Sequence, residues 1–571
     1  MKNSDVSALL STVADLLDIR GDNFFKIRAY RMASQIIHDL SEDIETVVNE
    51  KRLEHIDGIG PAITKKVTEY ITTGSLEYLK KLQKEIPPTL LELLTIPSLG
   101  PRKVSTLFNT LQIQTIEELK TACQQGKLRD LDGFGILTEH NILRGIALKE
   151  KTDGRIFLHH AMEISDHLIN YMKRCDQVEF LDVAGSLRRK KETIGDIDIL
   201  ISSPDPASVM EWAIEYPQIQ DVIAKGPTKT SILLKNTVQV DIRVVPKKSY
   251  GAALQYFTGS KEHNVGMRSR ALKQGFKLNE YGLFTKNDDL ACSCQREEEI
   301  YTTLNLSYIP PELRENRGEI KESDQGTLPI LITQEDIKGD IHVHSHYSDG
   351  QETIASIVQV AEQLGYEYIG IADHSQSLRV AHGLSHERVI KKAEEIKELN
   401  KTSKLAIFLG TECDILPNGE LDYDEDTLNL FDYVGIGIHT KFKMTEKEAT
   451  ERIIQGMTHP KVTFLAHPTC RLLGQRESLP IKMDALFDAA IATNTALEIN
   501  SFPDRLDLSD IHVKQARDKG AHFCIGTDAH TLDHLHYMKY GIATARRGWL
   551  SKNHVLNTQS LKKIQSFFKK T

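Results

Sequence analysis

The stretch GDIHVHSHYSDG, which begins at Gly339, places three histidines within five positions and an aspartate shortly after them. Imidazole nitrogens and carboxylate oxygens bind Zn²⁺ and Mn²⁺ in proteins. His342 and His344 stand two residues apart, so on a β-strand both side chains would project from one face. The stretch therefore indicates half of a metal site, with Asp349 as a further ligand and His346 as a non-ligand.

Apolar runs farther along the chain end in the same kinds of residue. The runs are YIGIADH, AIFLGTE, YVGIGIH, VTFLAH and HFCIGTDAH, and their candidate ligands are His374, Glu412, His439, His467, Asp528 and His530. These runs alternate with helical patterns, which is typical of parallel βα units, and ALEIN supplies another strand without a clear ligand. Because the C-terminal ends of such strands converge on one cavity, we expect a polynuclear Zn²⁺ or Mn²⁺ site on a βα barrel.

The middle of the chain carries a second set of acidic residues. In GDIDILIS, Asp196 and Asp198 share one face of a predicted strand, and TVQVDIRVV places Asp241 in another strand. Crowded carboxylates repel one another unless a cation lies between them, and Mg²⁺ prefers oxygen ligands. This pattern is typical of nucleotidyltransferases, in which two ions activate a hydroxyl group and stabilise the leaving pyrophosphate.

A short basic turn precedes these strands. Gly185 and Ser186 are followed by Arg188 and Arg189 in AGSLRRKK. Backbone N–H, hydroxyl and guanidinium groups are the donors that hold phosphate oxygens. We therefore expect this turn to bind the triphosphate of a nucleotide.

Three loops in the first third of the chain resemble one another. They are IDGIGPAITKKV, IPSLGPRKVSTL and LDGFGILTEHNI, in which Ser98 replaces one glycine of the second loop. Glycines permit a tight turn, and the next helix then presents free N–H groups that bind phosphate without reading bases. The loops resemble helix-hairpin-helix motifs, which implies contact with the DNA backbone at Gly58, Gly60, Gly100, Gly133 and Gly135.

The segment YFTGSKEHNVGMR, from Tyr256 to Arg268, closely resembles family X DNA polymerases. This resemblance implies that Tyr256, Phe257 and Gly259 pack against the incoming sugar. It also implies that Asn264 and Arg268 contact the nascent base pair and the template.

The resemblance to family X also marks a lysine in the first hairpin region. Some members use a lysine at the position of Lys66 to form a Schiff base with a deoxyribose phosphate. Ala62 stands where a second lysine is often found. Lyase chemistry and a phosphate-facing or plain surface lysine are therefore both open at Lys66.

The C-terminal motifs resemble the PHP (polymerase and histidinol phosphatase) domain, a trinuclear metallophosphoesterase. The resemblance implies three divalent ions, Zn²⁺ and/or Mn²⁺, held by His342, His344, Asp349, His374, Glu412, His439, His467, Asp528 and His530. Such ions lower the pKa of a bound water and neutralise phosphate oxygens. From its position after the His467 strand, Arg471 is a further candidate for a phosphate contact.

The bulk properties exclude several classes of protein. No stretch approaches the ~18 apolar residues of a membrane span, and the N-terminal segment has the pattern of an amphipathic helix, not of a signal peptide. Seven scattered cysteines fit a reducing cytoplasm, and Cys292–Cys294 is not expected to bind a metal. The net charge of −9 argues against a surface that binds nucleic acid everywhere, although it allows local basic patches.

Taken together, the motifs resemble a bacterial family X DNA polymerase with a C-terminal PHP domain. This implies a multidomain α+β and α/β protein with a helical N-terminal region, a nucleotidyltransferase palm and thumb, and a distorted (βα)7 barrel. The expected domains are a DNA-end-binding domain (1–80), a fingers-like domain with a further helix-hairpin-helix (81–151), the palm (152–247), the thumb (248–313), a linker (314–337) and the PHP domain (338–571).

We expect a polymerase that fills short gaps in DNA base excision repair with Mg²⁺ or Mn²⁺. Its substrates would be dNTPs and gapped or nicked DNA, and we expect a monomer. The barrel would be a Mn²⁺-dependent 3′–5′ exonuclease, with AP endonuclease and 3′-phosphatase activity as extensions. Two alternatives stay open: a polymerase fused to a small-molecule phosphatase, and a DNA-end scaffold whose polymerase site is idle.

Overall fold

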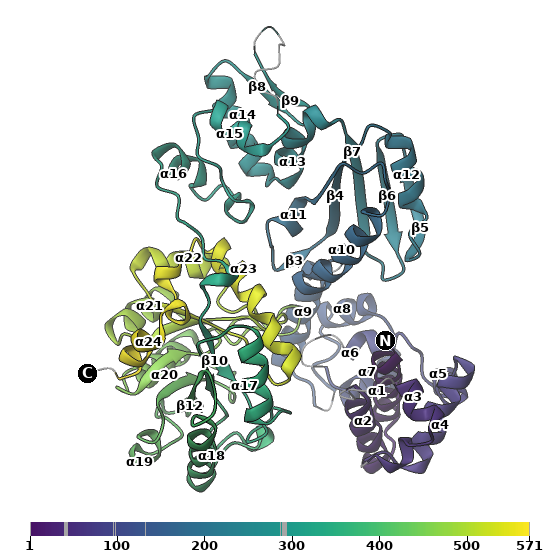
Figure 1. Ribbon diagram of the computed structural model, residues 1–571. Coiled ribbons are helices and arrows are strands. Elements are labelled where there is room, and N and C mark those ends of the chain that lie inside the picture. Colours follow the sequence, from purple (N-terminus) through teal and green to yellow (C-terminus); the bar gives the residue numbers. More distant parts are fainter. Residues whose placement is uncertain are drawn as a thin grey trace. The chain divides into compact units, whose positions relative to one another are not determined.

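The protein is described from a computed structural model (Figure 1). The structure describes residues 2–569, with the exception of 39–43, 57, 95, 97–98, 132, 153, 286 and 288–293. Ser98 and Cys292 lie outside the described residues. The chain divides into two compact units: residues 1–153 with 474–476, and residues 154–473 with 477–571.

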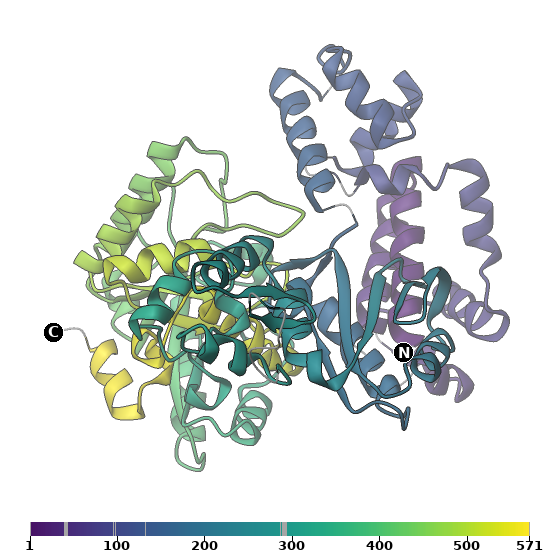
Figure 2. The same ribbon diagram turned by 90° about the horizontal axis from the view of Figure 1, so that it is seen from above.

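The first unit is helical along its described residues, as the purple to blue segment of Figure 2 shows. Its helices are α1 (Lys2–Arg20), α2 (Phe24–His38), α3 (Ile44–Asn49), α4 (Pro61–Thr73), α5 (Glu77–Glu85), α6 (Leu90–Leu94), α7 (Pro101–Leu111), α8 (Ile116–Gln124) and α9 (Ile136–Thr152). Local sequence sets several of their ends. Thr115 and Glu118 form a capping box at the start of α8, and Gly74 ends α4 in the left-handed conformation.

The second unit begins with a five-stranded sheet in the order β2-β4-β7-β6-β5. Its strands are β2 (Phe180–Val183), β4 (Asp196–Ser202), β5 (Ile219–Lys225), β6 (Lys229–Leu234) and β7 (Gln239–Val245). Helices α10 (Leu158–Met172) and α12 (Pro206–Ile214) supply Leu168 and Val209 to the same apolar core. Strands β4 and β7 are parallel, so Asp196 and Asp198 of β4 lie toward the same end of the sheet as Asp241 of β7.

A mostly helical region follows the sheet. Its elements are α13 (Tyr250–Thr258), α14 (Lys261–Lys273), β8 (Lys277–Asn279), β9 (Gly282–Phe284), α15 (Glu297–Thr303), η3 (Pro311–Leu313) and α16 (Glu319–Gln325). Residues 314–337, expected as a linker, include α16 and pack against this region. Arg314 and Glu319 are fully buried. Each has a partner for its charge: Arg314 pairs with Glu297, and Glu319 pairs with His263. Two of the charged residues in 314–337 therefore form buried ion pairs with the helical region.

The rest of the second unit is a barrel of seven parallel strands in sequential order. The strands are β10 (Gly339–Val343), β11 (Tyr368–Ile371), β12 (Ala406–Asp414), β13 (Tyr433–Gly437), β14 (Val462–Leu465), β15 (Ala496–Asn500) and β16 (Phe523–Gly526). Val343 of the first strand forms a parallel bridge with Ala529, just after the last strand, and this bridge nearly closes the barrel. The (βα)7 architecture is thereby confirmed.

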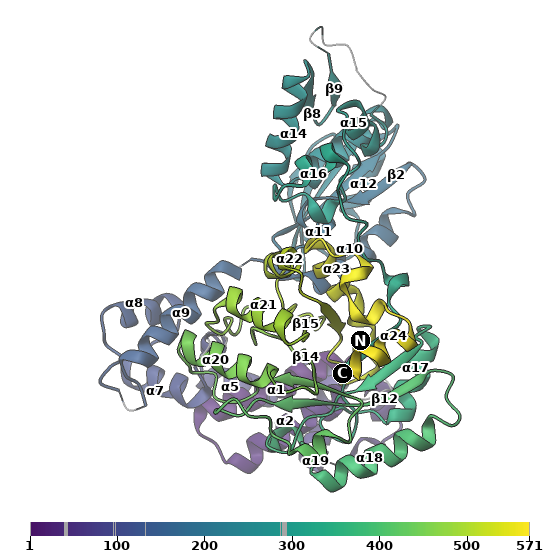
Figure 3. The same cartoon turned by 90° about the vertical axis from the view of Figure 1, so that its left-hand side faces the viewer.

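Helices cover the outside of the barrel (Figure 3). They are α17 (Ile354–Gln363), α18 (His386–Leu399), α20 (Glu446–Met457) and α21 (Met483–Ala492), with α22 (Asp510–Lys519) and α23 (Met538–Arg547) after them. Aromatic rings fill the interior, and α24 (Leu561–Phe568) adds Phe568 to that cluster. A Cβ on Gly410 would lie 2.1 Å from Cζ of Tyr433, so the strand needs glycine to admit this ring.

Two further findings bear on the sequence analysis. Cys413, Cys470 and Cys524 are buried, whereas Cys294 is disulfide-bonded. Among the described residues, no helix combines the length and apolarity that crossing a membrane requires.

Candidate active sites in the barrel and the palm

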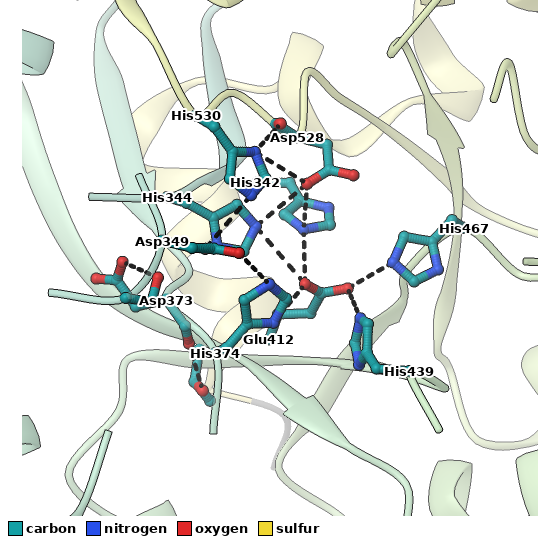
Figure 4. Close-up of polar contacts among 12 residues, drawn as sticks. His342, His344, Asp349, Asp373, His374, Glu412, His439, His467, Asp528 and His530 are labelled. Carbon is teal, nitrogen blue, oxygen red and sulfur yellow. Dashed lines mark hydrogen bonds and ion pairs between the residues drawn. The ribbon is translucent and has the colours of Figure 1, made fainter. Parts of the chain in front are cut away.

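The nine candidate ligands of the barrel lie together at the C-terminal ends of its strands (Figure 4). They form three overlapping groups, in each of which the possible ligand atoms lie within 4.8 Å of one another. The groups are His344, Asp349, His374 and His530; His342, His344, Glu412 and Asp528; and His374, Glu412 and His439. His467 stands outside these groups and approaches Glu412. The strand ends thus bring all nine predicted residues into one cluster.

Glu412 lies at the centre of the cluster. Its Oε2 is 3.3 Å from Nε2 of His342 and 3.2 Å from Nδ1 of His374. Its Oε1 is 3.0 Å from Nε2 of His439 and 2.7 Å from Nε2 of His467. Nε2 of His344 is also 3.6 Å from Oε2, so this one carboxylate lies beside five imidazoles, an arrangement suited to neighbouring cations.

Many polar atoms of this cluster have no hydrogen-bond partner although they are buried. They include Nε2 of His342, both ring nitrogens of His344, Oδ1 of Asp349, Nδ1 of His374, Oε2 of Glu412 and Nδ1 of His467. Leaving a buried polar atom unpaired costs about 1–3 kcal/mol, so such a set is expected where cations bind. The nitrogen and oxygen donors fit Zn²⁺ or Mn²⁺.

The charges of the cluster are strongly coupled. Burial opposes ionisation of Glu412, but the facing imidazoles of His439 and His342 outweigh it and hold the Glu412 pKa well below its usual range. Burial and the charge of His344 lower the pKa of His374 to about 3, so this imidazole is neutral and ready to bind a metal. Metal binding at such sites competes with protons.

Carboxylates that no sequence motif predicted lie behind the ligands and orient them. Glu498 accepts a hydrogen bond from Nδ1 of His342 at 2.5 Å, which aims Nε2 into the cluster. Asp414 lies 3.2 Å from Nδ1 of His439 in the same role. The available signal for Glu498 was a carboxylate inside the apolar strand ALEIN.

Asp373, just before His374, is a third supporting carboxylate. It accepts hydrogen bonds from the Ser345 backbone at 2.7 Å and from the Ser348 hydroxyl at 2.7 Å, next to His344. Lys392 compensates its charge, with Nζ 2.8 Å from the Asp373 carboxylate. The loops that carry His344 and His374 are thereby fixed to one buried ion pair.

Two arginines beside the cluster differ in their surroundings. Arg471 donates from Nε to the backbone oxygen of Arg505 at 3.0 Å and pairs with Glu192 at 2.8 Å, so it holds a loop in place. Nε of Arg505 lies 3.5 Å from Asp528, beside the candidate ligands. Within the described part of the chain, the Arg505 guanidinium donates no hydrogen bond, so its donors are available to a ligand.

The three palm aspartates lie on neighbouring strands. Asp196 and Asp198 belong to β4, and Asp198 stands opposite Asp241 of β7. Burial and the charges of Asp196 and Asp241 raise the pKa of Asp198 to about 7. Lys229 lies 2.7 Å from Asp241 and balances part of this charge. The trio is not among the close ligand groups found within the described residues.

The predicted nucleotide-binding residues surround these aspartates. Gly185 has a φ of +59°, and a Cβ there would lie 2.1 Å from Oδ2 of Asp198, so only glycine fits. Ser186 follows it in the short helix α11 (Gly185–Arg188), and Arg189 comes directly after that helix. A Cβ at Gly259 would lie 3.1 Å from the Arg189 guanidinium.

The YFTGS segment ends α13 and packs beside β7. The ring of Phe257 lies 4.4 Å from the guanidinium carbon of Arg243 and contacts Tyr256 edge to face. Asn264 donates to the Tyr256 backbone oxygen at 2.7 Å, which ties α14 to this segment. Arg268 is exposed on α14, farther along the same helix.

The three hairpin loops of the first unit share one backbone pattern. The backbone N–H of Ile59 bonds to Ile56, that of Leu99 to Ile96, and that of Phe134 to Leu131, at 3.0–3.1 Å. Gly60, Gly100 and Gly135 then precede the first turns of α4, α7 and α9. A Cβ at Gly60, Gly100, Gly133 or Gly135 would meet no atom within 4 Å, whereas one at Gly58 would strike Ile36. The four open glycines could admit a phosphate backbone.

Lys66 lies on α4, between two aromatic rings. Its Nζ is 5.0 Å from the ring centre of Tyr78 and 5.9 Å from that of Tyr30, and it donates to the Ala62 backbone oxygen. Lys26 lies 5.3 Å from the Tyr78 ring. Two lysines thus share one aromatic surface.

Family models match most of the chain. They describe a helix-hairpin-helix domain (1–76), a SAM-like helix-hairpin-helix tandem (90–147), a DNA polymerase beta palm (155–255), a DNA polymerase beta thumb (253–315) and a PHP domain (340–502). These matches agree with the helical first unit, the five-stranded sheet and the barrel.

Named relatives agree with the family models. The chain is 38% identical over the full length of both proteins to DNA polymerase/3′-5′ exonuclease PolX of Bacillus subtilis (strain 168). It is 26% identical to DNA polymerase lambda of Rattus norvegicus over 55% of this chain and 56% of that protein. It is 28% identical to Repair DNA polymerase X of African swine fever virus over 23% of this chain and 78% of that protein. The chain therefore belongs to the bacterial family X DNA polymerases that carry a C-terminal PHP domain.

Proposed function

We propose that this enzyme fills short gaps during base excision repair and trims 3′ ends before it extends them. Two separate sites support these two activities: a carboxylate site on the palm sheet for extension and the nine-residue cluster in the barrel for trimming. The observation that carries the proposal is the set of buried, unpaired ligand atoms in the barrel of a chain that also retains the palm aspartates.

In the palm, we assign Asp196, Asp198 and Asp241 to hold Mg²⁺ or Mn²⁺. When bound, these ions would supply charge stabilisation at the attacking hydroxyl and the leaving pyrophosphate. Gly185, Ser186 and Arg189 would hold the dNTP triphosphate through backbone, hydroxyl and guanidinium donors. Tyr256, Phe257 and Gly259 would pack against the sugar, while Asn264 and Arg268 would contact the nascent base pair and template.

In the barrel, we assign the nine clustered residues to three divalent ions, Zn²⁺ and/or Mn²⁺. Bound there, the ions would supply an activated water for hydrolysis of a phosphodiester. Arg505 adds fixed positive charge beside Asp528 and would bind a phosphate oxygen of the DNA 3′ end. Removal of 3′ phosphates and cleavage at abasic sites use the same chemistry and are proposed as secondary activities.

We propose the domain division 1–80, 81–151, 152–247, 248–313, 314–337 and 338–571. The open hairpin glycines would contact the DNA backbone and place a gapped or nicked duplex. Lys66 is the candidate for Schiff-base formation with a deoxyribose phosphate, and the neighbouring rings would shield it from water. We propose a monomer that acts on DNA in the cytoplasm.

The two alternatives are less well supported. A small-molecule phosphatase in the barrel would not account for the full-length similarity to a relative named a polymerase and 3′-5′ exonuclease. An idle scaffold would not need Gly185 in a conformation that accommodates the Asp198 carboxylate.

A gapped duplex with a 5′-labelled primer that ends in a mismatch tests the proposal. The protein is incubated with Mn²⁺, with and without dNTPs, and the primer length is followed. We expect shortening without dNTPs and extension with them. Extension without shortening would refute the exonuclease, and shortening without extension would refute the polymerase.

A further inference from the structure

Arg547 ends the barrel helix α23, and its side chain contacts residues of the palm and thumb. It donates to the backbone oxygen of Arg189 at 2.6 Å and to the Glu315 carboxylate at 3.0 Å. On the barrel side, its other terminal nitrogen bonds to Asp510 of α22 at 2.7 Å. Its side chain is 4% exposed, so these bonds form away from water.

Arg189 is held from two further sides. Its Nε lies 3.1 Å from the same Glu315 oxygen, and a terminal nitrogen donates to the Thr258 backbone oxygen at 2.5 Å. Glu315 therefore lies between two guanidinium groups, those of Arg189 and Arg547. Thr258 belongs to the YFTGS segment, so this network joins the phosphate-binding turn to the sugar-binding segment.

Guanidinium and carboxylate groups alternate along the network, from Arg189 through Glu315 and Arg547 to Asp510. Burial opposes ionisation of Glu315, but the charges of Arg547 and Arg189 outweigh it and keep the Glu315 pKa below its usual value. Arg189 and Glu315 are each 11% exposed. A guanidinium fixed in one rotamer before binding loses less conformational entropy when it meets an anion.

We propose that Arg547 is a positioning residue of the polymerase site, through which the barrel holds Arg189 in place for the triphosphate of an incoming nucleotide. Arg547 fixes the backbone of Arg189 directly and its side chain through Glu315. The inference rests on the proposed role of Arg189 in the palm. It gives the barrel a function in nucleotide binding that is separate from its metal cluster.

A purely adhesive role for Arg547 is the competing explanation, and the neighbouring residue provides the matched control. Arg546 belongs to the same helix. Its side chain pairs with Glu312 at 2.7 Å and donates to the Ile332 backbone oxygen at 2.9 Å. It joins the barrel to the thumb region as Arg547 does, but within the described residues its hydrogen bonds and ion pairs do not involve Arg189.

The test compares the full-length variants Arg547→Lys, Glu315→Gln and Arg546→Gln. Lysine keeps the charge but lacks the planar fork that bonds several partners at once. We expect Arg547→Lys and Glu315→Gln to raise the KM for dNTP on gapped DNA about tenfold, with 3′–5′ digestion within about twofold of the unaltered enzyme. Inorganic tripolyphosphate, measured by calorimetry, should lose affinity by the same factor. Arg546→Gln should change neither constant.

The double variant Arg547→Lys, Glu315→Gln should be no worse than either single variant, because both changes release the same side chain. An equal rise in KM for Arg546→Gln, or unchanged tripolyphosphate affinity in both other variants, would overturn the proposal. Thermal unfolding identifies a variant that fails to fold. The other of Arg547→Lys and Glu315→Gln then tests the proposal. Absence of extension by the unaltered enzyme would refute the palm function instead, while tripolyphosphate binding would still test the positioning.

Discussion

At the residue scale, single substitutions should separate the two sites. Asp198→Asn removes one palm carboxylate charge at nearly constant volume, and we expect primer extension to fall about a thousandfold with digestion retained. His344→Ala removes a side chain shared by two ligand groups of the barrel, and we expect the reverse. Both activities are measured on one labelled primer. Loss of both activities in either folded variant would contradict the existence of separate sites.

The carboxylates behind the ligands give a second residue-scale prediction. Glu498→Gln removes the charged acceptor that orients His342, and we expect metal affinity at the barrel to fall about 10- to 100-fold. The metal bound per chain is measured after dialysis against buffered Zn²⁺ or Mn²⁺. Glu394→Gln, an exposed change on α18, is the control and should leave the metal content unchanged. Equal metal retention by both variants would show that Glu498 does not support the site.

At the scale of elements, Glu297 joins α15 to α11 and to the segment after η3. It accepts hydrogen bonds from Arg188 at 2.8 and 2.7 Å and from Arg314 at 2.7 Å. Burial opposes its ionisation, but Arg314 and Arg188 outweigh this effect and lower the pKa of Glu297 to about 2, from 4.5. Its ionised form therefore stabilises the folded state above about pH 4.5, and this contribution is lost as the pH falls toward 2.

Glu297→Gln should consequently lower the stability of this region by about 3–5 kcal/mol at pH 7, because two arginines lose their buried partner. The difference from the unaltered protein should shrink as the pH falls below about 4.5. Urea unfolding at several pH values measures it. Glu298→Gln, an exposed neighbour on α15, should have little effect at any pH. A difference that does not change with pH would mean that packing, not charge, accounts for the loss.

At the scale of the whole molecule, metal ions should stabilise the fold as well as support catalysis. The unpaired ligand atoms belong to strands β10 and β12 and to the segments that follow β10, β11 and β14, so ions bound among them would hold these parts of the barrel together. Chelation should abolish digestion and lower the thermal midpoint. Readdition of Mn²⁺ at 100 times its Kd should restore about 2.7 kcal/mol per site. A midpoint that is insensitive to chelator and Mn²⁺ would argue against ion binding in this cluster.

Local patterns in the sequence were sufficient to predict the class of each site. The two-residue spacing of His342 and His344 places both on one strand face, and ligands at the ends of successive apolar runs predict a barrel rim. Both signals are local: they depend on strand periodicity and on the order of parallel strands. The same holds for Asp196 and Asp198, and for the repeated glycine turns of the first unit.

The residues that support these sites from distant parts of the chain could be identified from the three-dimensional structure alone. His342 meets Glu498, 156 residues later, because β15 lies next to β16 and the barrel closes between β16 and β10. Arg547 meets Arg189 across 358 residues, and nothing in either local pattern predicts the pair. Such contacts arise from how packed elements meet in space, whereas strand periodicity reports only on neighbours along the chain.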